Sequence, residues 1–125
     1  MILDTLPVGM LQVNCYFLGC ERTRAAIIID PGDEPGAILA ALKRHDLKPA
    51  HILGTHGHFD HLLACRALQE ETGALFHLHP ADLPLVAAMQ RTCMAWLGYD
   101  PGEPPAVDRE LQSGETISAG DITLE

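Results

Sequence analysis

Residues 55–61 of this 125-residue chain read Thr-His-Gly-His-Phe-Asp-His. Three imidazoles and one carboxylate therefore fall within seven positions, and these groups are ligands for zinc and related transition metals. An apolar run precedes this segment and an amphipathic one follows it, so we expect a tight turn at the end of a strand. Side chains two positions apart on such a turn can converge on one point. The pattern predicts a metal-binding loop.

The spacing favours two adjacent metals. His56 and His58 would reach one of them, and Asp60 and His61 would aim at a point beside the first. Gly57 would let the backbone bend sharply where a side chain would obstruct it. In the alternative interpretation, Asp60 is only the N-cap of the next helix and the histidines are solvated. Because three of the chain's seven histidines occupy this one heptapeptide, the metal interpretation is favoured.

The heptapeptide resembles the His-x-His-x-Asp-His signature of the metallo-β-lactamase superfamily. Three flanking segments are similar too: Asn-Cys-Tyr at 14–16, Ile-Ile-Asp-Pro-Gly at 28–32 and Gly-Asp-Ile-Thr-Leu-Glu at 120–125. Together they are most similar to the glyoxalase II-like (hydroxyacylglutathione hydrolase-like) branch. The resemblance implies an α/β chain that forms the first half of an αββα sandwich, with a mixed β-sheet and helices on one face. The family's remaining metal ligands would follow residue 125, so we expect 1–125 to be a domain truncated at its C-terminus.

The same resemblance implies a hydrolase that uses a metal-bound hydroxide on a small ester or thioester, most plausibly of hydroxyacylglutathione type. It implies Zn²⁺ at two sites in the complete domain, with Fe or Mn as other candidates. Asp60 would also orient the nucleophile, while Thr55 and Gly57 would shape the loop. The alternatives are another enzyme of this fold (a lactonase, a β-lactamase or an iron persulfide dioxygenase) and an inactive, self-associating half-domain.

Asp30 follows the apolar run 25–29 and begins an Asp-Pro-Gly turn. It could accept backbone hydrogen bonds within that turn, with Gly32 providing conformational freedom. It could instead orient a metal-bound histidine or the motif loop, and the resemblance favours this role. The alternation of residues 74–79 places His77 and His79 on an exposed strand face, so we do not expect them to be ligands.

Composition argues against several classes of partner. The net charge is −9 and Lys plus Arg total only 8, which disfavours nucleic acid and anionic membrane surfaces. Asp4 stands where a secretory signal would carry basic residues, and no apolar run approaches the roughly 20 residues that span a bilayer. We therefore expect a cytoplasmic protein. The four cysteines form no Cys-x-x-Cys pair and sit in apolar contexts, which predicts reduced, buried thiols.

Apolar periodicity predicts alternating strands and helices. In the last predicted helix, Leu85, Met89, Cys93 and Trp96 recur at helical spacing, which indicates core packing or a lid. One sheet face would lack a cover, and a second copy of the chain could bury it in a homodimer. The expected strands are 2–8, 13–19, 25–29, 51–54 and 74–79; the expected helices are 35–45, 62–72 and 80–97; and a strand, a turn at 118–120 and a final strand occupy 111–125.

Overall fold

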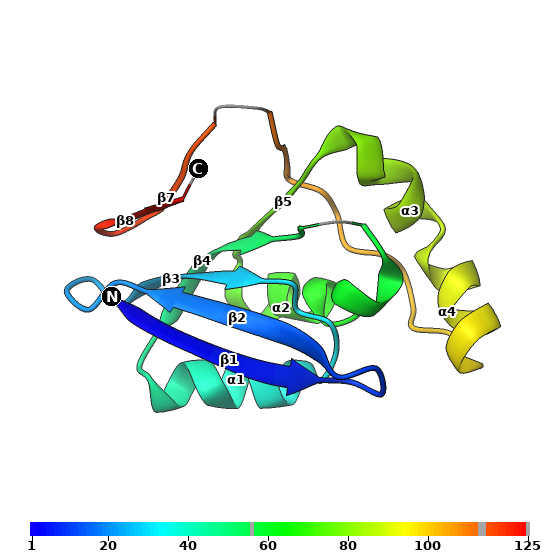
Figure 1. Cartoon of the computed structure of the whole chain (residues 1–125), viewed down its shortest axis with the longest axis horizontal. Coiled ribbons are helices and arrows are strands. Elements are labelled where there is room, and N and C mark those ends of the chain that lie inside the picture. The colour runs from blue at the N-terminus through cyan, green and yellow to red at the C-terminus, as the bar shows by residue number, and fades with distance from the viewer. Residues whose placement is uncertain (56, 113–114, 125) are drawn as a thin grey trace.

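The computed structural model describes residues 1–55, 57–112 and 115–124. Within them, six strands form one sheet in the order in which they occur along the chain (Figure 1). The first three strands pair antiparallel, and the third to sixth pair parallel, so the expected mixed sheet is confirmed. The strands are β1 (Ile2–Val8), β2 (Val13–Gly19), β3 (Ala25–Ile29), β4 (Lys48–Leu53), β5 (Leu75–Leu78) and β6 (Arg109–Glu110).

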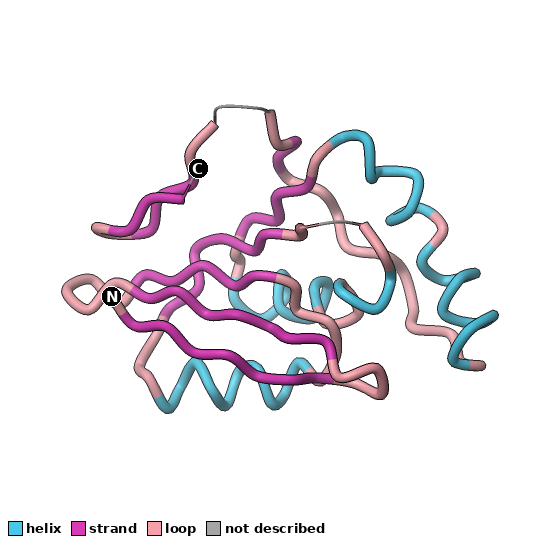
Figure 2. Tube along the Cα trace, viewed as in Figure 1, coloured by secondary structure: helices cyan, strands magenta, loops and turns pink. Residues whose placement is uncertain are grey.

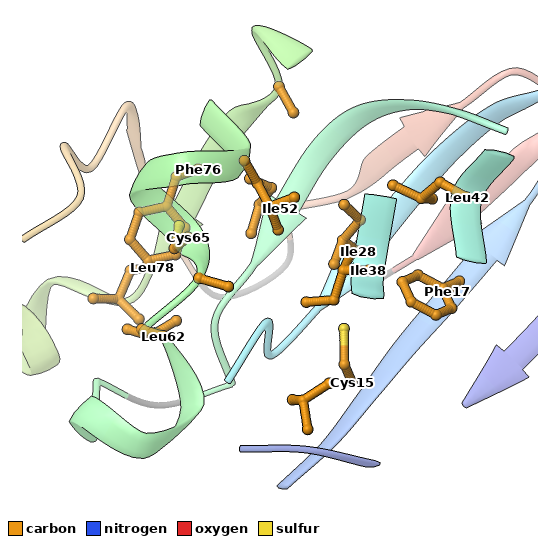
Figure 3. Packing of buried hydrophobic residues seen from close by; sticks show 14 of the residues in the cluster. Cys15, Phe17, Ile28, Ile38, Leu42, Ile52, Leu62, Cys65, Phe76 and Leu78 are labelled. Atoms are coloured by element: carbon orange, nitrogen blue, oxygen red, sulfur yellow. The ribbon is translucent and has the colours of Figure 1, made fainter. Parts of the chain in front are cut away.

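Helices α1 (Pro35–Arg44) and α2 (Cys65–Thr72) cover one face of this sheet (Figures 1 and 2). Alternate strand residues point into the layer between sheet and helices, as a period of two requires. Figure 3 shows Phe17, Ile28 and Ile52 from the strands against Ile38 of α1. All four side chains are fully buried. This core fixes β3 and β4, the two strands that lead into the candidate site.

The opposite face of the sheet carries a small hairpin made of β7 (Ile117–Ala119) and β8 (Ile122–Leu124). Ile117 and Ala119 pack on Leu18 and Ile27, which are thereby buried. The expectation of a bare face is therefore wrong near the hairpin. Toward the β1 edge the face stays open, where Leu3 is 62% exposed.

The helices after the motif differ from expectation. The predicted helix 62–72 begins only at Cys65, after a 3₁₀ turn at Phe59–His61 (η1). Its early amides bond elsewhere: the amides of Leu63 and Ala64 donate to the carbonyls of the Asp-Pro-Gly turn. These tertiary hydrogen bonds replace the first helical turn.

The predicted helix 80–97 is divided into the 3₁₀ turn η2 (Pro80–Asp82), α3 (Leu83–Ala87) and α4 (Met89–Leu97). Pro84 accounts for the first division, since its ring would clash with the carbonyl four residues earlier in a continuous α-helix. Nothing in the sequence marks the second division, at Ala88. The strand, turn and final strand expected within 111–125 are found as the β7–β8 hairpin, although its first strand begins only at Ile117. The short strand β6, which pairs with β5, was not expected.

Two histidines outside the motif have specific side-chain partners. His77 is only 8% exposed, and its Nε2 lies 2.9 Å from Nδ1 of His51. The prediction of an exposed face was wrong because His77 lies beside Leu53 in the sheet, and Leu53 packs against the cluster that the β7–β8 hairpin covers. His45 places Nε2 2.9 Å from a carboxylate oxygen of Asp4. His79 is exposed, as predicted, and its Nδ1 accepts a hydrogen bond from the amide of Ala81.

The four cysteines are buried free thiols, and desolvation raises the pKa of Cys15 to about 12. Among the described helices, none combines the length and apolarity that a bilayer crossing requires.

Candidate metal centre

The motif loop leaves the sheet at the carboxyl end of β4, next to the end of β3. The Asp30 amide donates to the Leu53 carbonyl at 2.9 Å, which joins the two strand ends. The carboxyl ends of neighbouring parallel strands form the edge at which α/β proteins commonly place their ligand sites. The parallel pairing of β3 and β4 thus brings Asp30 beside residues 25 to 31 positions later in the sequence.

Asp30 is the buried centre of this arrangement. Its carboxylate accepts hydrogen bonds from the amide and the hydroxyl of Thr55, at 2.8 and 2.6 Å. Its Oδ2 also lies 3.2 Å from Nδ1 of His61. The side chain is buried and the backbone has φ +53°, a left-handed conformation that Asp tolerates better than most residues. Asp30 therefore contacts both the motif loop and one of its histidines.

The rest of the Asp-Pro-Gly turn holds the other end of the motif. The carbonyls of Pro31 and Gly32 accept hydrogen bonds from the amides of Ala64 and Leu63, at 3.0 and 3.1 Å. A Cβ added to Gly32 would lie 2.6 Å from the Asp60 carbonyl oxygen, a distance that only glycine permits. The conformational freedom expected at this position is not what glycine supplies, because Gly32 is absent from the described residues with positive φ. The requirement is space.

Asp60 and His61 lie side by side in the η1 turn. Nε2 of His61 is 3.8 Å from Oδ2 of Asp60, and two ligands of one tetrahedral zinc stand roughly 3.4 Å apart. Because Nδ1 of His61 faces Asp30, Nε2 is the nitrogen on the side where a metal would bind. The donor types and their separation fit a shared metal ion. The capping alternative for Asp60 is wrong, since Ala64 occupies the N-cap position of α2.

Gly57 is buried where the motif loop packs against η2 and α3. A Cβ at this position would lie 2.7 Å from the Asp82 carbonyl oxygen and 3.1 Å from Cβ of Leu85. A side chain is thus excluded by its neighbours, as the sequence suggested.

His58 is exposed and lines a pocket of about 370 Å³ together with Asp60. His56 lies outside the described residues, and with it the proposed pairing of His56 with His58. Within the parts of the chain that are described, no three His, Cys, Asp or Glu side chains converge on one metal position. The described contribution to a metal site is therefore the Asp60–His61 pair, with Asp30 and Thr55 behind it.

Sequence reasoning did not assign the other walls of this pocket. They include Leu11 from the β1–β2 turn, Leu85 from α3, and Trp96 from α4. The helical spacing of Leu85 and Trp96 suggested a lid as one of two roles. No sequence signal linked Leu11 to them, because the three residues are distant in the chain.

Comparisons with known proteins find hydrolases among the relatives of this chain. The chain is 39% identical to the probable metallo-hydrolase YqgX of Bacillus subtilis, over 96% of this chain and 56% of that protein. It is 36% identical to the hydroxyacylglutathione hydrolase GloC of Haemophilus influenzae, over 58% of this chain and 34% of that protein. Nearly all of this chain matches YqgX, yet the chain spans little more than half of the length of that protein.

Solved structures of related proteins share the fold of this chain. The crystal structure of the BLEG-1 B3 metallo-β-lactamase superposes with a TM-score of 0.85 and 28% identity, over 98% of this chain and 58% of that one. The crystal structure of TTHA1623 in a di-iron-bound form superposes with a TM-score of 0.82 and 37% identity, over 91% of this chain and 56% of that one. The expected half of the fold is thereby confirmed. The sequence also matches the family described as the metallo-beta-lactamase superfamily over residues 8–125, and the chain belongs to that superfamily.

Proposed function

We propose that this chain carries the first half of the active site of a metal-dependent hydrolase that cleaves a small thioester of hydroxyacylglutathione type. The observation that carries the proposal is the buried Asp30 carboxylate holding Nδ1 of His61, so that Nε2 stands beside Asp60. A carboxylate behind a histidine is the arrangement that orients metal-ligating imidazoles.

Each residue then has a defined task. Asp60 and His61 hold one metal, and His56 with His58 hold the second, as the family signature implies. A bound metal lowers the pKa of its water toward neutrality and polarises a carbonyl oxygen. Asp60 also orients the attacking oxygen. We propose zinc as the metal, with iron as the alternative that the di-iron form of TTHA1623 supports.

Support for a thioester substrate comes from the similarity to a hydroxyacylglutathione hydrolase. A β-lactamase is the second candidate, because the BLEG-1 enzyme shares the fold at 28% identity. Both substrates contain an electrophilic carbonyl that a bound metal would polarise. They differ in the group that leaves, a thiolate in one case and a ring nitrogen in the other.

The test measures bound metal per chain by plasma mass spectrometry, together with hydrolysis of S-lactoylglutathione and of a chromogenic cephalosporin. We expect about two metals per chain and faster thioester hydrolysis from a longer protein that also supplies the remaining ligands, and little of either from residues 1–125 alone. His61→Gln should weaken metal binding at least tenfold, as expected when an imidazole ligand is lost. His79→Gln, an exposed histidine outside the motif, serves as the matched control.

A longer protein that includes the remaining ligands, yet binds no stoichiometric metal and hydrolyses neither substrate, would contradict the proposal. If light scattering then showed a dimer, the inactive, self-associating half-domain would be the better description. Preferential cleavage of the cephalosporin would favour the β-lactamase instead.

A further inference from the structure

An apolar wall stands beside the proposed metal ligands. Leu11, Leu85 and Trp96 line the same pocket as His58 and Asp60. Figure 1 shows the segments that carry them gathered at one end of the molecule: the β1–β2 turn, the motif loop, and α3 with α4. The three side chains are 53%, 39% and 76% exposed. Hydrophobic side chains from three separate segments around one pocket indicate a surface that binds something.

Trp96 shows how this wall arises. Met89, Cys93 and Trp96 form one stripe along α4 at helical spacing. Met89 and Cys93 are buried in the core, whereas Trp96, the last member, reaches the pocket lining. The stripe therefore continues past the edge of the core. A large aromatic face is held in place by two buried anchors on its own helix.

We propose that Leu11, Leu85 and Trp96 bind the non-reacting hydrocarbon part of the acyl group, which makes Trp96 a residue that determines substrate specificity. This inference rests on the proposed function, since the reacting carbonyl is assigned to the Asp60 side of the pocket. The volume of about 370 Å³ suits a small molecule. Among the described lining residues there is no Lys or Arg to pair with an anionic group, which favours a neutral alkyl chain as the part that binds here.

The chain contains a single tryptophan, so its fluorescence reports on this wall alone. The probes are S-alkyl-N-acetylcysteamines from ethyl to octyl, thioethers that have no carbonyl to cleave. We expect a blue shift of Trp96 emission that grows with alkyl length. Affinity should rise by up to roughly fourfold for each methylene that is buried.

Three variants locate the binding surface. Leu85→Ala keeps the fluorescent reporter and should weaken octyl binding about tenfold, because it removes three carbon atoms from the wall. Trp96→Ala should weaken octyl binding at least as much, whereas Trp96→Phe should retain most of the affinity. Both variants lose the fluorescent reporter, so their affinities are measured by calorimetry. Met94→Ala is the matched control, since Met94 is half-exposed on the same helix but is not among the pocket-lining residues.

An affinity that does not depend on alkyl length, or an equal loss in Met94→Ala and Trp96→Ala, would overturn the inference. Thermal unfolding of each variant separates lost binding from lost folding. The two proposals fail differently. Thioether binding by this chain, with no thioester hydrolysis by a longer, metal-loaded protein that includes the remaining ligands, overturns only the proposed function. Hydrolysis at equal rates for acetyl and octanoyl thioesters, with unchanged Trp96 emission, overturns only the assignment of the wall.

Discussion

Asp30→Asn tests whether one buried carboxylate organises the candidate site. The substitution keeps the size of the side chain and one oxygen acceptor, but it removes the negative charge and replaces the second oxygen with an amide donor. In the structure, both carboxylate oxygens are used: Oδ1 accepts from the Thr55 amide, while Oδ2 accepts from the Thr55 hydroxyl and lies near Nδ1 of His61. One oxygen of asparagine cannot replace both.

The expected loss follows from these contacts. A hydrogen bond to a charged group contributes about 1.5–3 kcal/mol, and the carboxylate is only 5% exposed. Loss of one such bond, together with weakening of the others, should lower the free energy of unfolding by about 2–3 kcal/mol. Metal affinity should fall by about 10–100-fold, the usual effect of removing a carboxylate behind a ligating histidine.

Urea unfolding and metal titration against a chromophoric chelator measure the two effects. Asp46→Asn is the matched control: Asp46 has φ +52°, almost the same backbone conformation as Asp30, but it is exposed. Asparagine accepts this conformation readily, so the control should lie within about 0.5 kcal/mol of the parent chain. If Asp30→Asn behaves like Asp46→Asn in both assays, the carboxylate does not organise the site.

Two further predictions concern stability. Burial, and to a smaller extent the neighbouring His51, lowers the pKa of His77 below its ordinary 6.5. Just below pH 6.5 the unfolded chain therefore binds more protons at this residue than the folded chain does. The free energy of unfolding should decline as the pH drops below about 6.5. His77→Leu should reduce this slope in urea titrations from pH 5 to 8, and His79→Gln should not. Gly57→Ala should lower the free energy of unfolding by about 1–3 kcal/mol through overpacking. Gly36→Ala, in α1 where a Cβ meets nothing within 4 Å, should raise it by about 0.5–1 kcal/mol in the same assay; equal effects would refute the close-packing argument.

Much of the fold could be predicted because its signals are local. The strand pattern of residues 2–29 and the helix from Pro35 depend on periodicity within single segments, and both agree with the structure. The errors lie where tertiary contacts override local preference. The amides of Leu63 and Ala64 bond to carbonyls 31 and 33 residues earlier, and the sheet face that carries His77 and Leu53 is partly covered by the β7–β8 hairpin.

The candidate site divides in the same way. Asp60 and His61 are adjacent in the sequence, so their proximity could be anticipated from the chain alone. The contact of His61 with Asp30 depends on the parallel pairing of β3 and β4, and the sequence left two roles for Asp30 open. The contacts that the structure shows belong to the second role, because Thr55 of the motif loop and His61 share the Asp30 carboxylate.

The proposed metal ligands and the proposed specificity residues come from different parts of the chain, so substrate specificity could change separately from metal binding. The proposed metal ligands lie within one short loop, and both ends of that loop are fixed by the buried Asp-Pro-Gly turn. The apolar wall comes from three exposed segments that contribute no hydrogen bond to that turn among the described contacts. Under this proposal, substitutions at Leu11 or Trp96 change which acyl group fits without moving the metal ligands. Leu85 packs against Gly57 of the motif loop, so a change there reaches the ligands as well, and substitutions at Asp30 disturb the ligands whatever the substrate.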